Sequence, residues 1–149
     1  MATGTFTYGL RPACAVADAV RLLSDFSGHA ELHPLIVKVA ELPAAPGALR
    51  SFAIDDRLAV GPVRFTTTYH VDVLTATDDE VVTVARQRPA TTVHNHVRLR
   101  PEADGTVQID VEITLTAPRP LFGYAFRQAK AAHAALADRL TNALQGTGQ

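Results

Sequence analysis

Alternation of apolar and polar positions dominates the middle of this chain. From Val63 to Val73 and again from Val107 to Leu115, apolar or small side chains take every second position. Charged and polar residues fill most of the positions between them. Because successive side chains of a strand point to opposite faces, this pattern predicts half-buried strands. Weaker versions of the pattern predict further strands over residues 5–10, 35–42, 49–58, 81–87 and 92–100.

Three other stretches follow the period of a helix. A first helix is predicted over residues 16–23 and a second, short one over residues 29–33. A long C-terminal helix is predicted from Leu121 to about Leu144, ended by Gly146. An antiparallel sheet of about seven strands with one apolar face needs a cover, and this helix is the only large one. We therefore predict an α+β fold in one domain over residues 1–149, with a curved antiparallel sheet wrapped around the C-terminal helix.

The long helix carries one narrow apolar stripe. At 100° per residue, Arg127, Asp138 and Asn142 fall on the opposite side. The stripe is aromatic at its start, small in its middle and rich in leucine at its end, where ordinary core packing is expected. Its members are Phe122, Phe126, Ala129, His133, Leu136, Leu140 and Leu144.

His133 is the most informative residue of this stripe. One interpretation is a partly buried histidine satisfied by a sheet side chain or an ordered water. The other is a histidine that lines an internal cavity and offers a hydrogen bond or a proton to a ligand. Ala129 leaves the space that such a cavity needs, and Phe122 and Phe126 either gate it or belong to plain core.

Polar residues also interrupt the apolar faces of the predicted strands. Strand parity places Thr67 and Tyr69 on one such face and Asn95 on another. A buried amide or phenol needs a partner more urgently than a threonine hydroxyl, so Asn95 and Tyr69 rank above Thr67. No inward-facing carboxylate is expected from this parity. The predicted ligand-binding residues are Phe52, Ile54, Phe65, Thr67, Tyr69, Asn95, Val97, Phe122, Phe126, Ala129 and His133.

The order of these elements resembles that of the START-like superfamily, also called SRPBCC. The segment from Val16 to Phe26 and the following His33–Val39 are similar to its first helix, its second short helix and its second strand. Residues 60–69 also look like the corresponding strand in relatives of a small carbon monoxide dehydrogenase protein of this superfamily. The resemblance covers nearly the whole chain and is carried by element patterns, which support a fold better than an activity.

This resemblance implies a helix-grip architecture that encloses an apolar pocket. Members of the superfamily bind lipids, polyketides, hormones or other hydrophobic small molecules, and some catalyse aromatic cyclisation or dehydration. The expected function is binding of a lipid- or polyketide-like molecule between the sheet and the C-terminal helix. The alternative is a cyclase/dehydratase-like enzyme in which His133 acts as general acid/base and Tyr69 polarises a carbonyl. The likeness to the carbon monoxide dehydrogenase protein leaves open an accessory role in a larger complex.

Composition narrows the function classes. With 14 basic and 15 acidic residues, the formal net charge is −1, which argues against a dedicated nucleic-acid binder. A single cysteine, Cys14, and no apolar run long enough to span a membrane favour a cytoplasmic protein. The scarcity of lysine beside arginine, together with abundant alanine, is typical of a GC-rich bacterial genome. The pattern selects no oligomeric state.

No metal or cofactor is expected. His94 and His96 project to one face of a predicted strand about 7 Å apart, but a zinc ion there would need a third ligand. The chain also has no glycine-rich phosphate loop and no serine in a nucleophile-elbow pattern.

Overall fold

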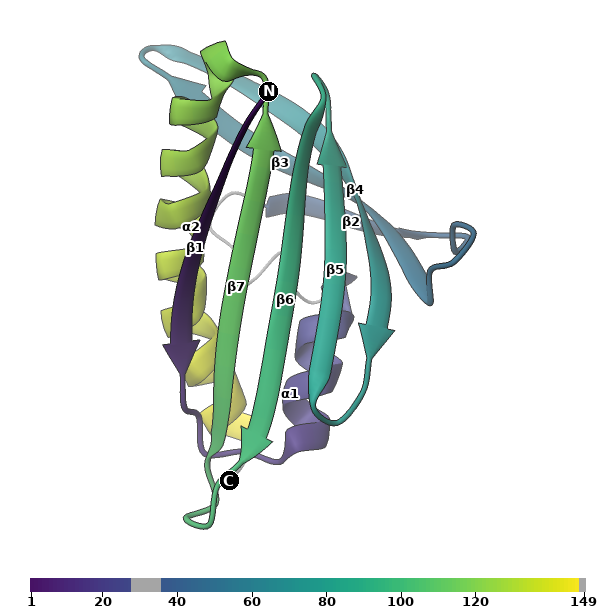
Figure 1. Cartoon of the computed structure of the whole chain (residues 1–149), viewed down its shortest axis with the longest axis vertical. Helices are drawn as coiled ribbons and strands as arrows, with labels where there is room; N and C mark the ends of the chain where they lie inside the picture. Colours follow the sequence, from purple (N-terminus) through teal and green to yellow (C-terminus); the bar gives the residue numbers. More distant parts are fainter. Residues whose placement is uncertain (28–35, 148–149) are drawn as a thin grey trace.

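A computed structural model describes residues 1–27 and 36–147 of the chain (Figure 1). The two helices are α1, Val16–Ser24, and α2, Arg119–Thr147. The strands are β1 Ala2–Leu10, β2 Ile36–Leu42, β3 Arg50–Val60, β4 Val63–Ala76, β5 Glu80–Gln87, β6 Thr91–Pro101 and β7 Val107–Ala117.

The strands form one sheet in the order β1-β7-β6-β5-β4-β3-β2. Every neighbouring pair is antiparallel, so β1 joins the sheet beside the last strand and the others follow as a meander. In Figure 1 the strands bend strongly from β7 to β2, and α2 runs along the edge formed by β1 and β7. Helix α1 contacts β4, β5 and β6, so both helices cover the concave face of the sheet.

The alternation in β7 explains how the sheet makes its core. Its odd-numbered positions from Val107 to Leu115 are buried, whereas Asp110 and Glu112 are exposed on the other face. Leu136, Leu140 and Leu144 of α2 belong to the same buried cluster. Full burial of each such side chain stabilises the fold by roughly 1.5–3 kcal/mol.

The start of α2 sits against the backbone of β1. A Cβ added at Gly4 would lie 2.7 Å from Cζ of Phe122 and 3.2 Å from Cε2 of Phe126. Phe126 also meets the ring of Phe6 edge-on, with 5.6 Å between the centroids. Glycine at position 4 therefore allows the two aromatic side chains to approach the strand closely.

The predicted fold class is confirmed, and the differences lie at element ends. Helix α2 begins at Arg119, two residues early, because the Pro118 carbonyl accepts hydrogen bonds from the backbone N–H groups of Leu121 and Phe122. It also continues through Gly146 to Thr147, so glycine does not end it there. The second short helix, expected over residues 29–33, lies outside the described residues. None of the described helices combines the length and the apolarity that a membrane span requires.

Candidate functional site: a cavity between α2 and the sheet

A cavity of about 240 Å³ lies between α2 and the concave face of the sheet. Residues from both helices and from every strand contribute to its wall, and apolar side chains make up most of it. On the side of α2, the wall includes the small residues Ala125, Ala129 and Ala132. Alanine at these positions cannot reach across to the sheet, so the space that a larger side chain would fill stays open.

Two polar residues of the wall come from the β3–β4 hairpin. Asp56 lies opposite Thr67 in the register and Ile54 lies opposite Tyr69, so Asp56 and Tyr69 are diagonal neighbours. The side chains of Asp56 and Tyr69 hydrogen-bond to each other. Burial raises the pKa of Asp56 to about 6, and the nearby Asp55 carboxylate acts in the same direction. Burial, with the Asp56 charge, also raises the pKa of Tyr69 well above its ordinary value.

A second polar pair joins β1 to α2. The Tyr8 hydroxyl lies 2.7 Å from Nδ1 of His133, within hydrogen-bond distance. Both residues contribute to the cavity wall. Burial raises the pKa of the Tyr8 hydroxyl far above its ordinary value, so this phenol stays protonated. Both interpretations of His133 therefore apply, since it has a partner from the sheet and also faces the cavity.

Several other polar atoms around the cavity are buried without a partner. Among the described residues, these atoms are Asp56 Oδ1, Asn95 Oδ1 and the Tyr124 hydroxyl, all from residues of the wall. Thr67 Oγ1, next to Asp56 across the β3–β4 pair, is in the same condition. A buried polar group without a hydrogen bond costs roughly 1–3 kcal/mol. Polar atoms left open on the wall of an apolar cavity are those that a ligand would satisfy.

The structure separates the predicted ligand-binding residues into two groups. Five of the eleven contribute to the cavity wall, namely Tyr69, Asn95, Val97, Ala129 and His133. Phe52 and Ile54 are fully buried in a second core cluster instead, and Phe65 is 39% exposed. Thr67 is absent from the described wall, and Phe122 and Phe126 pack on β1 at Gly4.

The most important residue that sequence reasoning missed is Asp56. The expectation that no carboxylate points inward is wrong, because Asp56 belongs to the cavity wall and is largely buried. The signal was present, since Phe52, Ile54, Asp56 and Leu58 continue one face of β3 at every second position. Tyr8 was missed for a similar reason, as it lies two residues after Phe6 on the inner face of β1.

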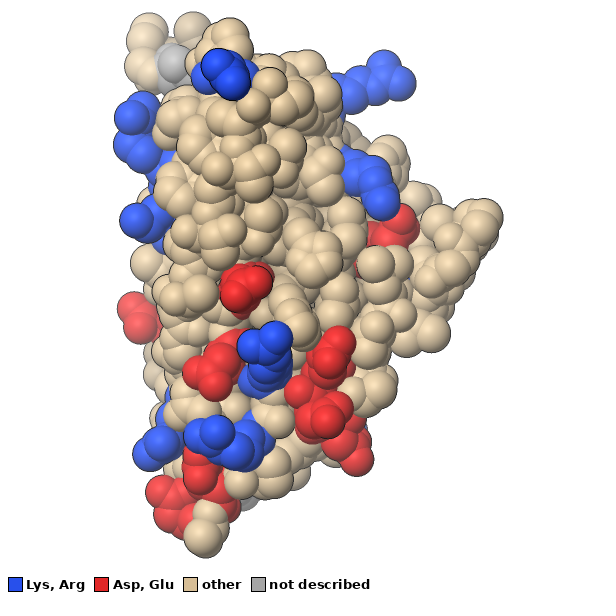
Figure 2. All heavy atoms as spheres, in the orientation of Figure 1, with Lys and Arg blue, Asp and Glu red and all other residues tan. Residues whose placement is uncertain are grey.

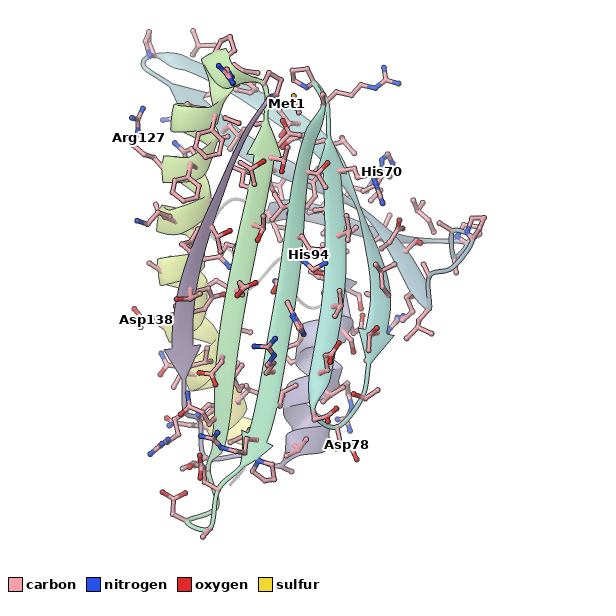
Figure 3. The ribbon with its side chains drawn as sticks, in the orientation of Figure 1. Met1, His70, Asp78, His94, Arg127 and Asp138 are labelled. Carbon is pink, nitrogen blue, oxygen red and sulfur yellow. The ribbon has the colours of Figure 1, made fainter. Side chains whose placement is uncertain are left out.

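Charged residues of other kinds lie away from the cavity. Figure 2 shows acidic and basic side chains mixed over the lower half of one face of the molecule. Arg127 and Asp138 project from α2 away from the sheet, as the helical stripe predicted (Figure 3). Among the described lining residues of the cavity there is one carboxylate and no lysine or arginine.

The histidines considered as metal ligands are spread over the sheet. His70 lies on β4 and His94 on β6, with β5 between them (Figure 3). His96 Nε2 lies 3.5 Å from a carboxylate oxygen of Glu80 on the neighbouring strand. Within residues 1–27 and 36–147, no three His, Cys, Asp or Glu side chains gather as a metal site requires.

Comparison with known proteins agrees with this architecture. A family model described as "Polyketide cyclase / dehydrase and lipid transport" matches residues 5–145. No curated protein matches the chain.

Solved structures share the fold at low sequence identity. A START superfamily protein from Mycobacterium smegmatis superposes with a TM-score of 0.74 at 13% identity, covering 96% of this chain and 98% of that one. The di-domain aromatase/cyclase StfQ of the steffimycin biosynthetic pathway also gives 0.74, at 20% identity, over 97% of this chain and 51% of its own. The Zhui aromatase/cyclase from Streptomyces sp. R1128 gives 0.65 at 15% identity, over 99% and 94%.

At these identities the structural likeness establishes the fold alone, and it confirms the resemblance to the START-like superfamily. The family model adds a match in sequence that extends over nearly the whole chain, from β1 into the last turns of α2. The chain belongs to the polyketide cyclase / dehydrase and lipid transport family.

Proposed function

We propose that this protein binds a small, mostly apolar molecule with at least one polar group in the cavity between α2 and the sheet. Apolar side chains supply the affinity, at about 25 cal/mol per Å² of buried apolar surface before the costs of association. Tyr69, Asn95 and His133 orient the ligand, together with Asp56. The observation that carries the proposal is the set of buried, unpartnered polar atoms on an otherwise apolar wall.

The size of the cavity limits the ligand. At about 240 Å³ it is somewhat smaller than the roughly 300–1,000 Å³ typical of pockets for drug-sized molecules. A compound of one or two rings suits this space better than a long acyl chain. Among the ligands of the family, a polyketide-like ring compound is therefore favoured over a lipid with extended chains.

Filling the cavity tests this proposal directly. Ala129→Leu places a larger side chain in the open space, whereas Ala131→Leu adds the same side chain at an exposed position of the same helix. Native mass spectrometry of protein purified from its own host is expected to show a retained small molecule on the wild type and on Ala131→Leu. Ala129→Leu is expected to lack it. A retained molecule on all three proteins would place its binding outside the cavity.

A second candidate function is acid–base catalysis on an enolisable ring ketone. The observation that favours it is the Asp56–Tyr69 pair, because a carboxyl with a pKa of about 6 can exchange a proton near neutral pH. Asp56 would take a proton next to the carbonyl while a tyrosine hydroxyl polarises the carbonyl oxygen. His133, expected to be the general acid/base, would act through its hydrogen bond with Tyr8.

Hydrogen exchange of a simple ketone distinguishes binding from catalysis. The α-hydrogens of 1-tetralone in D₂O, followed by ¹H NMR, are expected to exchange at least about tenfold faster with the wild type than with Asp56→Asn. The control variant Asp55→Asn, whose carboxylate accepts a hydrogen bond from Thr68 on the exposed side, is expected to match the wild type. Equal exchange by all three proteins would leave binding as the function.

A further inference from the structure

The charge of the cavity is one-sided. Asp56 contributes a carboxylate to the wall, and the described lining residues include no lysine or arginine that could neutralise it. The nearest charged neighbour identified is Asp55, which adds further negative charge. Tyr69 supplies a hydrogen bond to Asp56, yet Asp56 Oδ1 is buried with no partner among the described residues.

We propose that the cavity selects a one- or two-ring compound that carries a protonated amine, and that its ammonium group donates a hydrogen bond to Asp56 Oδ1. This inference rests on the proposed function and names the chemical class of the ligand. An ammonium group supplies both what Asp56 lacks, a positive charge and a hydrogen-bond donor. A carboxylate ligand would instead place two negative charges side by side in a poorly solvated space.

The aromatic residues of the wall support the same ligand class. Tyr8, Phe26, Tyr69 and Tyr124 all line the cavity. The negative face of an aromatic ring attracts a cation, and this attraction grows when water is excluded. The remaining acceptor, Asn95 Oδ1, is also buried and unpartnered among the described residues, so it favours a ligand that donates hydrogen bonds.

A matched series of three naphthalene probes tests charge selection. The probes are 2-naphthylmethylamine, 2-naphthylmethanol and 2-naphthoate, which share the ring system and differ in the charge of one substituent. Their dissociation constants are measured by titration calorimetry at about pH 8, where Asp56 is ionised. We expect the amine to bind at least about tenfold more tightly than the naphthoate, with the alcohol between them.

Variants then assign this selection to one carboxylate. Asp56→Asn is expected to weaken amine binding by about tenfold or more and to strengthen naphthoate binding, while the alcohol changes by less than about threefold. Asp55→Asn removes a neighbouring charge whose carboxylate bonds Thr68 at 2.6 Å, and all three affinities should stay within about threefold.

The outcomes separate this inference from the function on which it rests. If the three probes bind with similar affinity, or if Asp56→Asn leaves the ratio of amine to naphthoate unchanged, charge selection is overturned and binding of apolar molecules stands. If none of the three probes binds, the proposed function fails together with the inference.

Discussion

Toward the C-terminal end of α2, Leu140 and Leu144 join Val107 and Ile109 in a core cluster with almost no exposed surface. Around Ala129 the same helix faces the same sheet across a cavity of about 240 Å³. The closed end contains apolar side chains that satisfy one another, whereas the open part contains polar atoms without partners. The difference teaches that one helix can anchor the fold with one segment and leave room for a ligand with another.

The largest expected effect comes from opening the closed end. Leu140→Ala removes a side chain that is 1% exposed, and we expect it to lower the free energy of unfolding by about 2–5 kcal/mol. The control Leu121→Ala changes a leucine of the same helix that is 41% exposed and should cost less than about 1 kcal/mol. Urea denaturation followed by circular dichroism measures both. Equal losses would mean that the two ends of α2 contribute alike to stability.

The next effect comes from the carboxylate in the open part. Burial raises the pKa of Asp56 from 3.8 to about 6, so the folded protein holds this proton more tightly than the unfolded chain. Stability is therefore lost as the pH rises from about 4 to about 6, and the loss persists above that range. After allowance for partial solvent access, Asp56→Asn should stabilise the protein by about 1–2 kcal/mol at pH 8.

At about pH 4 the same substitution should change stability far less, because Asp56 is then protonated in the folded state. Urea denaturation at both pH values measures the difference. Asp55→Asn is the control, since it removes the adjacent carboxylate, which bonds Thr68 on the exposed side. A stabilisation by Asp56→Asn that is the same at both pH values would argue against burial of the charge as its cause.

A smaller effect is expected from the link between β1 and α2 at the edge of the cavity. Tyr8→Phe removes the hydroxyl that lies 2.7 Å from Nδ1 of His133, and His133→Leu leaves that hydroxyl without this partner. Each substitution should fold normally. A double-mutant cycle is expected to give a coupling free energy of about 1 kcal/mol. Additive effects would show that the two side chains do not stabilise each other.

The smallest effect concerns the contact between β1 and the start of α2. Gly4→Ala puts a Cβ 2.7 Å from Cζ of Phe122, so the ring must shift and stability should fall by about 1 kcal/mol. Gly123→Ala adds the same methyl group where nothing lies within 4 Å, and it should stabilise the helix by up to about 1 kcal/mol. Thermal unfolding distinguishes the opposite signs. A lower melting temperature for Gly123→Ala would contradict the open space around it.

Sequence reasoning predicted the fold and part of the site. The alternation in β4 and β7 and the stripe on α2 lead to the seven-stranded sheet covered by a long helix. Tyr69, Asn95, Ala129 and His133 were selected from the same patterns, and all four contribute to the cavity wall. Their role in binding stays a prediction. Phe52 and Ile54 share a face with Asp56, but they are buried in a separate cluster farther along the strand.

What the sequence by itself determined is the inward or outward direction of each side chain, because strand and helix periods depend only on local backbone geometry. Only the tertiary structure decided which inward positions meet in solid core and which surround a cavity, since that depends on how strongly the sheet curves and where α2 crosses it. It also brought Asp56 beside Tyr69 and Tyr8 beside His133, residues that are 13 and 125 positions apart in the chain. Burial, which raises the pKa of Asp56, comes from the assembled molecule, and no local pattern contains it.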